Sequence, residues 1–174
     1  MRYMLALAVA LTMVGAAGSF AQEKEQARPD FSGEWVLDPE KSGVEEDQEG
    51  RRRQGNPPAM IVGQNGKELV VTRLRRGRDG GETKTVLTYS LEGKKTKNKT
   101  EFGKMESTAR WLDDGASLEL YSWSEVRREG MKFTVETFQT WSLADGALVI
   151  ETVRTTPRGE MKSTAVYERA AKEQ

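Results

Sequence analysis

The sequence predicts an all-β domain in which about 8–10 antiparallel strands follow one another as an up-and-down meander and close into a barrel. Glycine-bearing turns recur about every 10 to 16 residues, a spacing typical of successive antiparallel strands. Threonine, valine and aromatic residues dominate the segments between them, and no segment carries the long apolar stripe of a packed helix. An open sheet of this many strands would expose two long edges, which closure removes.

The first predicted strand covers residues 31–38, where Phe31, Gly33, Trp35 and Leu37 alternate with polar side chains on a common face. After Pro57-Pro58 the further predicted strands lie at residues 60–64, 67–75, 83–91, 96–102, 105–112, 118–127, 131–143, 148–156 and 160–169.

The turn at Asp145-Gly146 predicts the register of one hairpin. A type I′ turn needs φ > 0 at both central residues, which aspartate and glycine tolerate best. Folding there sets Leu143 against Leu148 and Trp141 against Ile150.

Closure is favoured by the first and last strands, which are regular and free of proline and can therefore pair. Small and polar residues are interspersed in the strands after residue 105, which leaves room on an inner face. A flattened two-sheet sandwich is compatible with the same periodicity.

Residues 1–21 are typical of a secretory signal peptide: Arg2 precedes an almost wholly apolar run at 4–17, and Ser19-Phe20-Ala21 offers small residues for cleavage. The run is too short to span a bilayer comfortably, since that takes roughly 20 residues. We therefore expect an exported domain at 22–174, in a periplasm or outside the cell, without stable membrane insertion.

Residues 40–56 lack periodicity and carry the charge blocks Glu45-Glu46-Asp47 and Arg51-Arg52-Arg53, which predicts a long charged loop. The arginine triplet could hold an anion or could simply balance the neighbouring acids.

Composition excludes several classes of function. The chain has no cysteine and no histidine, so disulfides, thiolate chemistry and the usual general base and metal ligand are absent. The near-neutral charge gives no broad reason to bind nucleic acid. No nucleotide, calcium or hydrolase motif occurs, so we expect neither an enzyme nor a cofactor. Asn98-Lys99-Thr100 fits a glycosylation sequon.

The opening Phe31-Ser32-Gly33-Glu34-Trp35 resembles the G-x-W strand of the calycin superfamily, which includes lipocalins and fatty-acid-binding proteins. The close at Val166-Tyr167-Glu168-Arg169 resembles the end of the fatty-acid-binding proteins. Residues 30–42 look like the start of secreted bacterial lipocalin-like proteins of largely unknown function. The resemblance implies a closed barrel with an internal ligand site.

The resemblance also implies roles for individual residues. Trp35 would lie at the closed end of the barrel under a basic residue, with Arg169 the first candidate and Arg154 the second, and Gly33 would complete the motif. Tyr167 matches the tyrosine of the R-x-Y pair that holds a ligand carboxylate in fatty-acid-binding proteins, but Ala165 stands in the arginine position.

The candidate ligand-binding residues are aromatic side chains and arginines that lie within strands. An internal arginine would need a partner and would mark an anion site. Alternatively, the aromatic residues fill a core, Trp123 and Tyr121 lie outside beside Glu119 and Glu125, and an arginine such as Arg110 faces outward opposite Glu119. The candidates are Trp111, Trp123, Phe138, Trp141, Tyr167, Arg73, Arg110 and Arg154.

Two hypotheses of function follow. The first is an exported, non-enzymatic protein that binds a small apolar or amphipathic ligand in a barrel cavity. The second is a structural or protein-interaction module with a filled barrel, which works through loop 40–56 or residues 73–78. The sequence does not set the oligomeric state.

Overall fold

The computed structural model describes residues 28–43, 45–46, 52–53, 57–76, 81–100, 103–128 and 130–171. These residues form strands and no helix. The strands are β1 (Gly33–Asp38), β2 (Glu45–Glu46), β3 (Arg52–Arg53), β4 (Ala59–Gln64), β5 (Glu68–Arg76), β6 (Glu82–Ser90), β7 (Thr96–Thr100), β8 (Gly103–Trp111), β9 (Leu118–Arg128), β10 (Met131–Ala144), β11 (Ala147–Thr156) and β12 (Gly159–Arg169).

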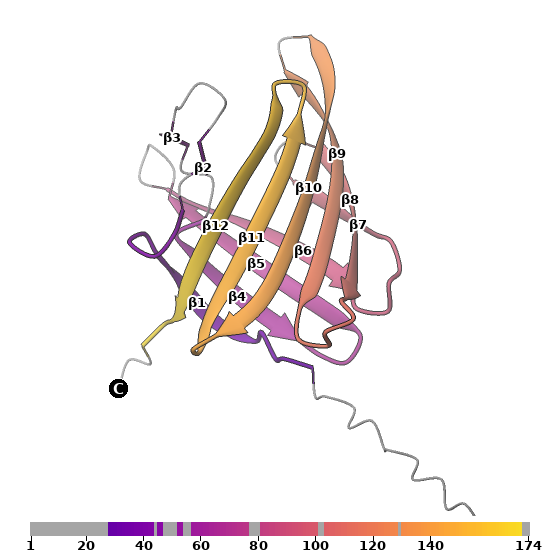
Figure 1. Cartoon of the computed structure of the whole chain (residues 1–174). Helices are drawn as coiled ribbons and strands as arrows, with labels where there is room; N and C mark the ends of the chain where they lie inside the picture. Colours follow the sequence, from indigo (N-terminus) through magenta and orange to yellow (C-terminus); the bar gives the residue numbers. More distant parts are fainter. Residues whose placement is uncertain are drawn as a thin grey trace, which may run out of the picture.

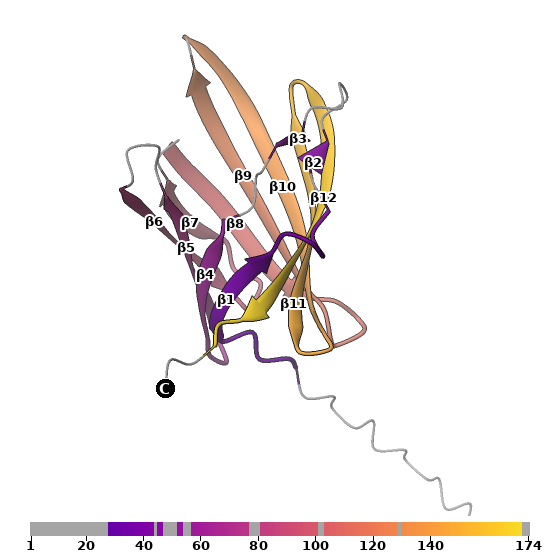
Figure 2. The same ribbon diagram turned by 90° about the vertical axis from the view of Figure 1, so that its left-hand side faces the viewer.

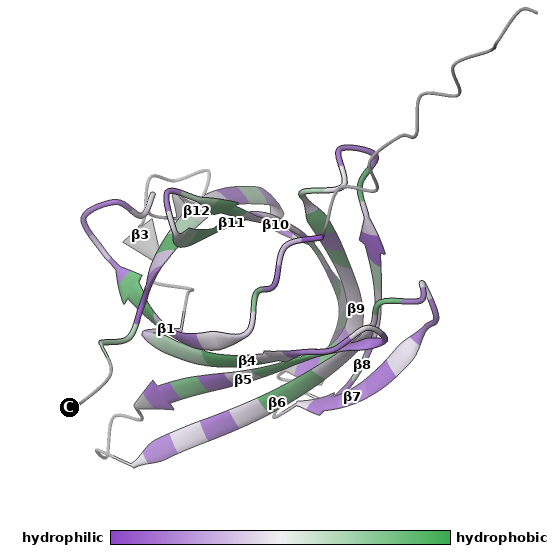
Figure 3. Cartoon of the chain, turned by 90° about the horizontal axis from the view of Figure 1, so that it is seen from below, coloured by the Kyte–Doolittle hydropathy of each residue, from purple (hydrophilic) through white to green (hydrophobic). Residues whose placement is uncertain are grey.

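Ten strands form one antiparallel sheet in the order β6-β5-β4-β1-β12-β11-β10-β9-β8-β7. β1 pairs with β12, with Trp35 opposite Arg169, so the predicted pairing of the first and last strands is confirmed. The sheet curls until its edge strands β6 and β7 lie side by side (Figures 1 and 3). The fold is therefore a nearly closed up-and-down barrel and not a two-sheet sandwich.

Figure 2 shows two walls of the barrel, with β4, β5 and β6 on one side and β10, β11 and β12 on the other. We call the end that holds the β10–β11 turn and the C-terminus the lower end, as drawn in Figure 1. The β9–β10 hairpin reaches farthest toward the opposite, upper end, because β10 is the longest strand at 14 residues.

The hairpin predicted at Asp145-Gly146 is confirmed. Asp145 has φ 51° and Gly146 has φ 81°, as a type I′ turn requires. The register follows from the turn: Leu143 lies opposite Leu148 and Trp141 lies opposite Ile150, as predicted.

The predicted charged loop at 40–56 contains a short ladder. β2 and β3 pair antiparallel, with Glu45 opposite Arg53 and Glu46 opposite Arg52, so this part of the segment is not loop. Two residues a strand are too few to produce the alternation by which longer strands are recognised. The rest of residues 44–56, like the predicted signal peptide at 1–21, lies outside the described residues.

No helix in the described ranges is long and apolar enough to cross a membrane.

Candidate functional site

Large apolar side chains pack the lower part of the barrel interior. Burying each contributes about 1.5–3 kcal/mol, which makes this cluster the main source of stability. We call it the floor. Its largest fully buried members are Trp35, Trp141, Tyr167, Phe31, Met60, Leu69, Leu118, Leu120, Leu148 and Val71.

The main chain before β1 crosses the lower end of the barrel (Figure 3). The Phe31 ring stacks on Trp111 with centroids 5.9 Å apart and meets Trp141 edge-on at the same distance. The Gln64 side chain fastens this segment, because its Oε1 accepts the Phe31 N–H at 3.1 Å. Phe31 therefore acts as a plug at the bottom of the floor, and the strand predicted to contain it begins two residues later.

The predicted contact between Trp35 and Arg169 is present at this lower end. The guanidinium carbon of Arg169 lies 4.6 Å from the centroid of the Trp35 ring, and its Nη1 donates to the Ser32 carbonyl at 3.0 Å. Gly33 leaves space for that guanidinium, since a Cβ there would lie 2.6 Å from Nη1. The second candidate, Arg154, lies on β11, opposite Thr137 on β10 and Met161 on β12.

Arg73 lies inside the barrel, directly above the floor. Its Nη2 donates to Gln139 Oε1 at 3.3 Å, although β5 and β10 are not neighbours in the sheet, so the two side chains meet across the interior. Gln139 in turn donates to Thr152 Oγ1 at 3.3 Å. The Arg73 Nε is buried and has no hydrogen-bond partner among the described residues.

Charge is sorted between the two faces of the sheet. Side chains along a strand point alternately to the two faces, so the inward positions are those an even number of residues from the buried core residues of that strand. Every acidic residue of the ten-stranded sheet lies an odd number of residues from them and therefore points outward. The outward acids are Glu34, Asp38, Glu68, Glu82, Glu106, Glu119, Glu125, Glu136, Glu151, Glu160 and Glu168.

The inward positions of β5 and β11, by contrast, hold Arg73, Arg75 and Arg154. The interior above the floor therefore offers guanidinium groups, amides and hydroxyls, and the described strands supply no inward carboxylate. A guanidinium presents five N–H donors and suits carboxylate, sulfonate or phosphate oxygens.

Two buried phenols lie near Arg73. Burial raises the pKa of Tyr89 and of Tyr167 above the usual range, and the positive charge of Arg73 opposes this shift in both. The Tyr167 hydroxyl donates to the Pro57 carbonyl at 3.1 Å. Both phenols therefore stay protonated at neutral pH and are available as neutral polar groups, not as bases.

The barrel seam between β6 and β7 is closed by a side chain instead of a backbone ladder. Asn98 Oδ1 accepts the Thr88 N–H at 2.8 Å, and Asn98 Nδ2 donates to the Thr88 carbonyl at 2.9 Å and to Ser107 Oγ at 3.0 Å. Thr96 Oγ1 adds a bond to the same carbonyl at 2.8 Å. Asn98 is 7% exposed, so the sequon asparagine is a buried clasp in the folded protein.

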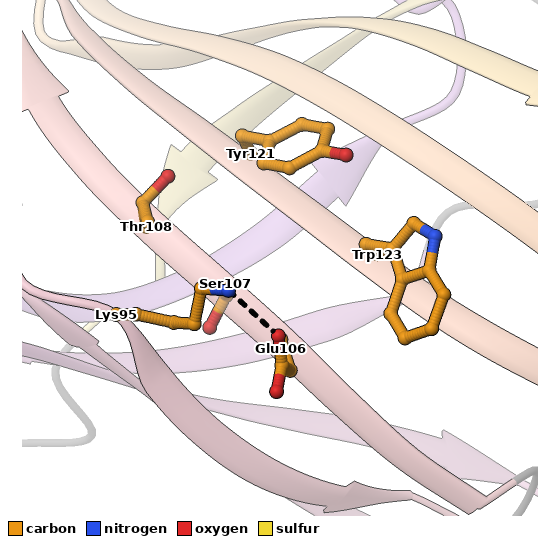
Figure 4. A pocket seen from close by; sticks show the side chains of 6 residues that line it. All are labelled: Lys95, Glu106, Ser107, Thr108, Tyr121 and Trp123. Atoms are coloured by element: carbon orange, nitrogen blue, oxygen red, sulfur yellow. Dashed lines mark hydrogen bonds and ion pairs between the residues drawn. The ribbon is translucent and has the colours of Figure 1, made fainter.

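The outer face of β8 to β10 carries an aromatic cluster. Tyr121 and Phe138 lie on adjacent strands with ring centroids 4.7 Å apart, and Trp123 and Phe138 are 36% and 42% exposed. A hollow of about 260 Å³ lies beside them (Figure 4), lined by Lys95, Glu106, Ser107, Thr108, Tyr121 and Trp123.

Electrostatics around Tyr121 involve both neighbouring elements. Partial burial raises the pKa of Tyr121, the Glu136 carboxylate raises it further, and the Lys95 ammonium opposes both. Lys95 Nζ lies 2.9 Å from Glu106 Oε2, the dashed contact in Figure 4.

The structure divides the predicted ligand-binding residues into three groups. Arg73 and Arg154 occupy inward positions above the floor. Trp111, Trp141 and Tyr167 belong to the packed floor or border it. Trp123, Phe138 and Arg110 lie outside, so the prediction that they line the interior is wrong.

The reason for the error is that long strands here carry aromatic side chains on both faces, and alternation alone does not say which face is inner. Arg110 takes the alternative considered from sequence, an outward ion pair with Glu119 at 2.6 Å. The sequence did not lead us to include Gln139, Thr152 or Asn98 among the candidate site residues. The polar character of the first two on a shared face with Trp141 was the available signal.

No group of three or more acidic residues in the described ranges is placed to hold a metal ion. The arrangement can bind and orient an anion, and the described strands place no pair of carboxylates inside the barrel.

No protein-family model and no curated protein sequence matches the chain. Among solved structures, it is similar to zebrafish ileal bile acid-binding protein complexed with cholic acid, with a TM-score of 0.51 and 14% identity over 80% of this chain and 98% of that one. A mutant of the REP1-NXSQ fatty acid transporter gives 0.48 and 12%, over 80% and 97%. A luciferase domain from the dinoflagellate Lingulodinium polyedrum gives 0.46 and 8%, over 79% and 42%. The similarity to the zebrafish protein shows the barrel fold.

Proposed function

We propose that this protein is an exported, non-enzymatic binding protein that holds a small amphipathic anion inside its barrel, with the anionic group on Arg73. The observation that carries the proposal is the environment of that guanidinium. It lies in the interior, makes one long hydrogen bond to a neutral amide, and faces no inward carboxylate of the described strands. Arg73 is half-buried with its Nε fully buried, and a charge that is partly removed from water without a counter-charge is costly, so an anionic ligand would remove part of that cost.

The surroundings of Arg73 also suit an amphipathic molecule. The apolar floor lies directly below it, and hydroxyl and amide groups such as Gln139 and Thr152 lie beside it. The zebrafish protein that shares this fold is complexed with cholic acid, which is likewise an amphipathic acid. Arg73 would take the part that the last-strand arginine plays in fatty-acid-binding proteins, because Ala165 occupies that position here.

The filled-barrel alternative receives support from the floor alone. Large side chains occupy the lower part of the interior, whereas the inward positions above Arg73 are mostly small or polar. A ligand is therefore expected in the upper part.

The binding test compares dodecanoate with dodecanol by isothermal titration calorimetry. We expect the purified protein to bind dodecanoate more tightly than the neutral alcohol. Arg73→Met should weaken dodecanoate binding by roughly 10-fold or more, because a hydrogen bond to a charged group is worth about 1.5–3 kcal/mol, and should leave dodecanol unchanged. The matched control is Arg110→Met, which removes an outward arginine already paired with Glu119. Equal losses in both variants, or no binding of either probe, would contradict the proposal.

Export has a separate test. Native mass spectrometry of protein recovered from the periplasm or medium should show a chain that begins at about Gln22, with any retained ligand lost on denaturation. A full-length chain confined to the cytoplasm would overturn export without affecting the binding site.

A further inference from the structure

We propose that the hollow on the outer face of β8 and β9 is a second site, which binds an alkylammonium group against Trp123, Tyr121 and Glu106, with Glu136 on the other side of Trp123 adding negative charge. This site is independent of the interior one and prefers the opposite charge. Its two sources in nature would be a free organic amine and a lysine side chain of a partner protein.

Strand register builds the site. Trp123 is directly opposite Glu106 on β8 and directly opposite Glu136 on β10, so one indole lies between two carboxylates on the same outer row. On the adjacent row, Tyr121 lies between Thr108 and Phe138. Directly opposite side chains on antiparallel strands have Cβ atoms about 4.5–5.5 Å apart, close enough to contact one ligand.

The chemistry of this lining suits an organic cation. Aromatic faces attract ammonium groups through the ring quadrupole, and tryptophan is the best of them. Nearby carboxylates add charge, and the apolar rings accept the carbon atoms of the ligand. Figure 4 shows Trp123, Tyr121 and Glu106 around the same hollow.

One ammonium group of the chain itself, that of Lys95, already lies at the hollow and pairs with one of its carboxylates. Lys95 Nζ binds Glu106 at 2.9 Å, although the Lys95 side chain is 63% exposed and comes from the turn before β7. An exposed pair of this kind is held weakly, so an external ammonium can displace it.

Glu136 supplies the charge that Lys95 does not neutralise. Within the described part of the chain no basic side chain lies within ion-pair distance of Glu136, and its negative charge raises the pKa of the neighbouring Tyr121. The other acids bordering the aromatic cluster are paired, Glu119 with Arg110 and Glu125 with Lys132. A bound cation would complete the pairing on this row.

The probe is hexyltrimethylammonium, titrated while the indole N–H signals are followed by ¹H–¹⁵N NMR. We expect a shift confined to Trp123, since Trp35 and Trp141 are fully buried and Trp111 packs against the Phe31 plug. Affinity should be roughly millimolar and should fall with added salt. Hexanol and hexanesulfonate are the matched neutral and anionic probes, and neither should reproduce the shift.

Three variants separate this site from a general apolar patch. Trp123→Leu should reduce affinity by about 5-fold or more, and Glu136→Gln by about 2- to 5-fold. Lys95→Met should raise affinity by about 2-fold or more, because it removes the internal competitor for Glu106. Glu160→Gln on β12 is the control carboxylate and should change nothing.

A pentalysine peptide distinguishes the two sources. Tighter binding of the peptide than of hexyltrimethylammonium supports a partner protein, and the reverse order supports a small amine. Equal shifts with hexanol, no shift of the Trp123 signal, or a loss of affinity in Lys95→Met would overturn the proposal. Arg73→Met should leave this titration unchanged, so the two sites can fail independently.

Discussion

The substitution Asn98→Asp is the sharpest test of how this barrel closes. The change keeps the size and shape of the side chain, and the remaining oxygen can still accept the Thr88 N–H. It replaces the amide nitrogen, which donates to the Thr88 carbonyl at 2.9 Å and to Ser107 Oγ at 3.0 Å, with an acceptor.

The cost follows from these contacts. Two buried hydrogen bonds are lost at about 0.5–1.5 kcal/mol each, and an ionised oxygen is left facing a carbonyl in a site that is 7% exposed. We expect the free energy of unfolding to fall by about 2–4 kcal/mol at pH 7, a large part of the total for a domain of this size. Urea unfolding followed by tryptophan fluorescence measures the loss.

The matched control is Asn65→Asp. Asn65 Oδ1 accepts the Lys67 and Glu68 N–H groups, both at 2.8 Å, and a carboxylate oxygen can do the same. Because this turn uses the side chain as an acceptor, its substitution should change stability by no more than about 0.5 kcal/mol.

The pH dependence supplies a second readout. Burial beside acceptors favours the protonated form of the introduced carboxyl, so its pKa in the folded variant lies above the unfolded value. The penalty is therefore present when the group is ionised, and it should shrink as pH falls through the raised pKa and the group can donate again. Equal losses for the two asparagines at pH 7, or a penalty that does not change with pH, would refute the assignment of Asn98 as the clasp.

Other substitutions and conditions give further expected outcomes. Gly33→Ala should lower the free energy of unfolding by about 1–3 kcal/mol, because φ is 146° and the new Cβ would lie 2.6 Å from Arg169 Nη1; a denaturation midpoint equal to wild type would contradict this. Arg169→Met removes the cation from the Trp35 ring and one hydrogen bond, for an expected loss of about 1–2 kcal/mol by the same measurement, against no change in Lys162→Met on the same strand. Tyr167→Phe leaves the Pro57 carbonyl without its donor and should cost about 1–2 kcal/mol. Tyr89 and Tyr167 hold their protons when folded and release them at about pH 10 when unfolded, so stability should fall as pH rises above 10; phenolate absorbance that appeared near pH 10 without unfolding would argue against their burial.

Local chemistry was enough to predict the strands, one hairpin and the closing pair of strands. Asp145-Gly146 sets a register because the backbone φ it needs restricts the turn to a two-residue type. The pairing of β1 with β12 and the stacking of Arg169 on Trp35 followed from a short motif at each end of the chain. In these cases the residues that decide the outcome are adjacent in sequence or belong to recognisable strand ends.

Tertiary structure decided which face of each strand is inner. Alternation groups Trp141 with Gln139 and Trp123 with Tyr121, but it assigns neither pair to the core. Curvature of the whole sheet makes that assignment, and it sends one indole into the floor and the other to the surface.

Contacts across the barrel were likewise beyond sequence reasoning. Arg73 meets Gln139, 66 residues away on a strand that is not its neighbour, and Asn98 reaches the backbone of an edge strand to close the seam. Neither contact has a local signal, because a tripeptide such as Asn98-Lys99-Thr100 has the same appearance whether its asparagine is exposed or buried. Both contacts exist because a twisted ten-stranded sheet loses its exposed edges only by curling until the edge strands β6 and β7 meet, which also brings β5 and β10 to face each other across the interior.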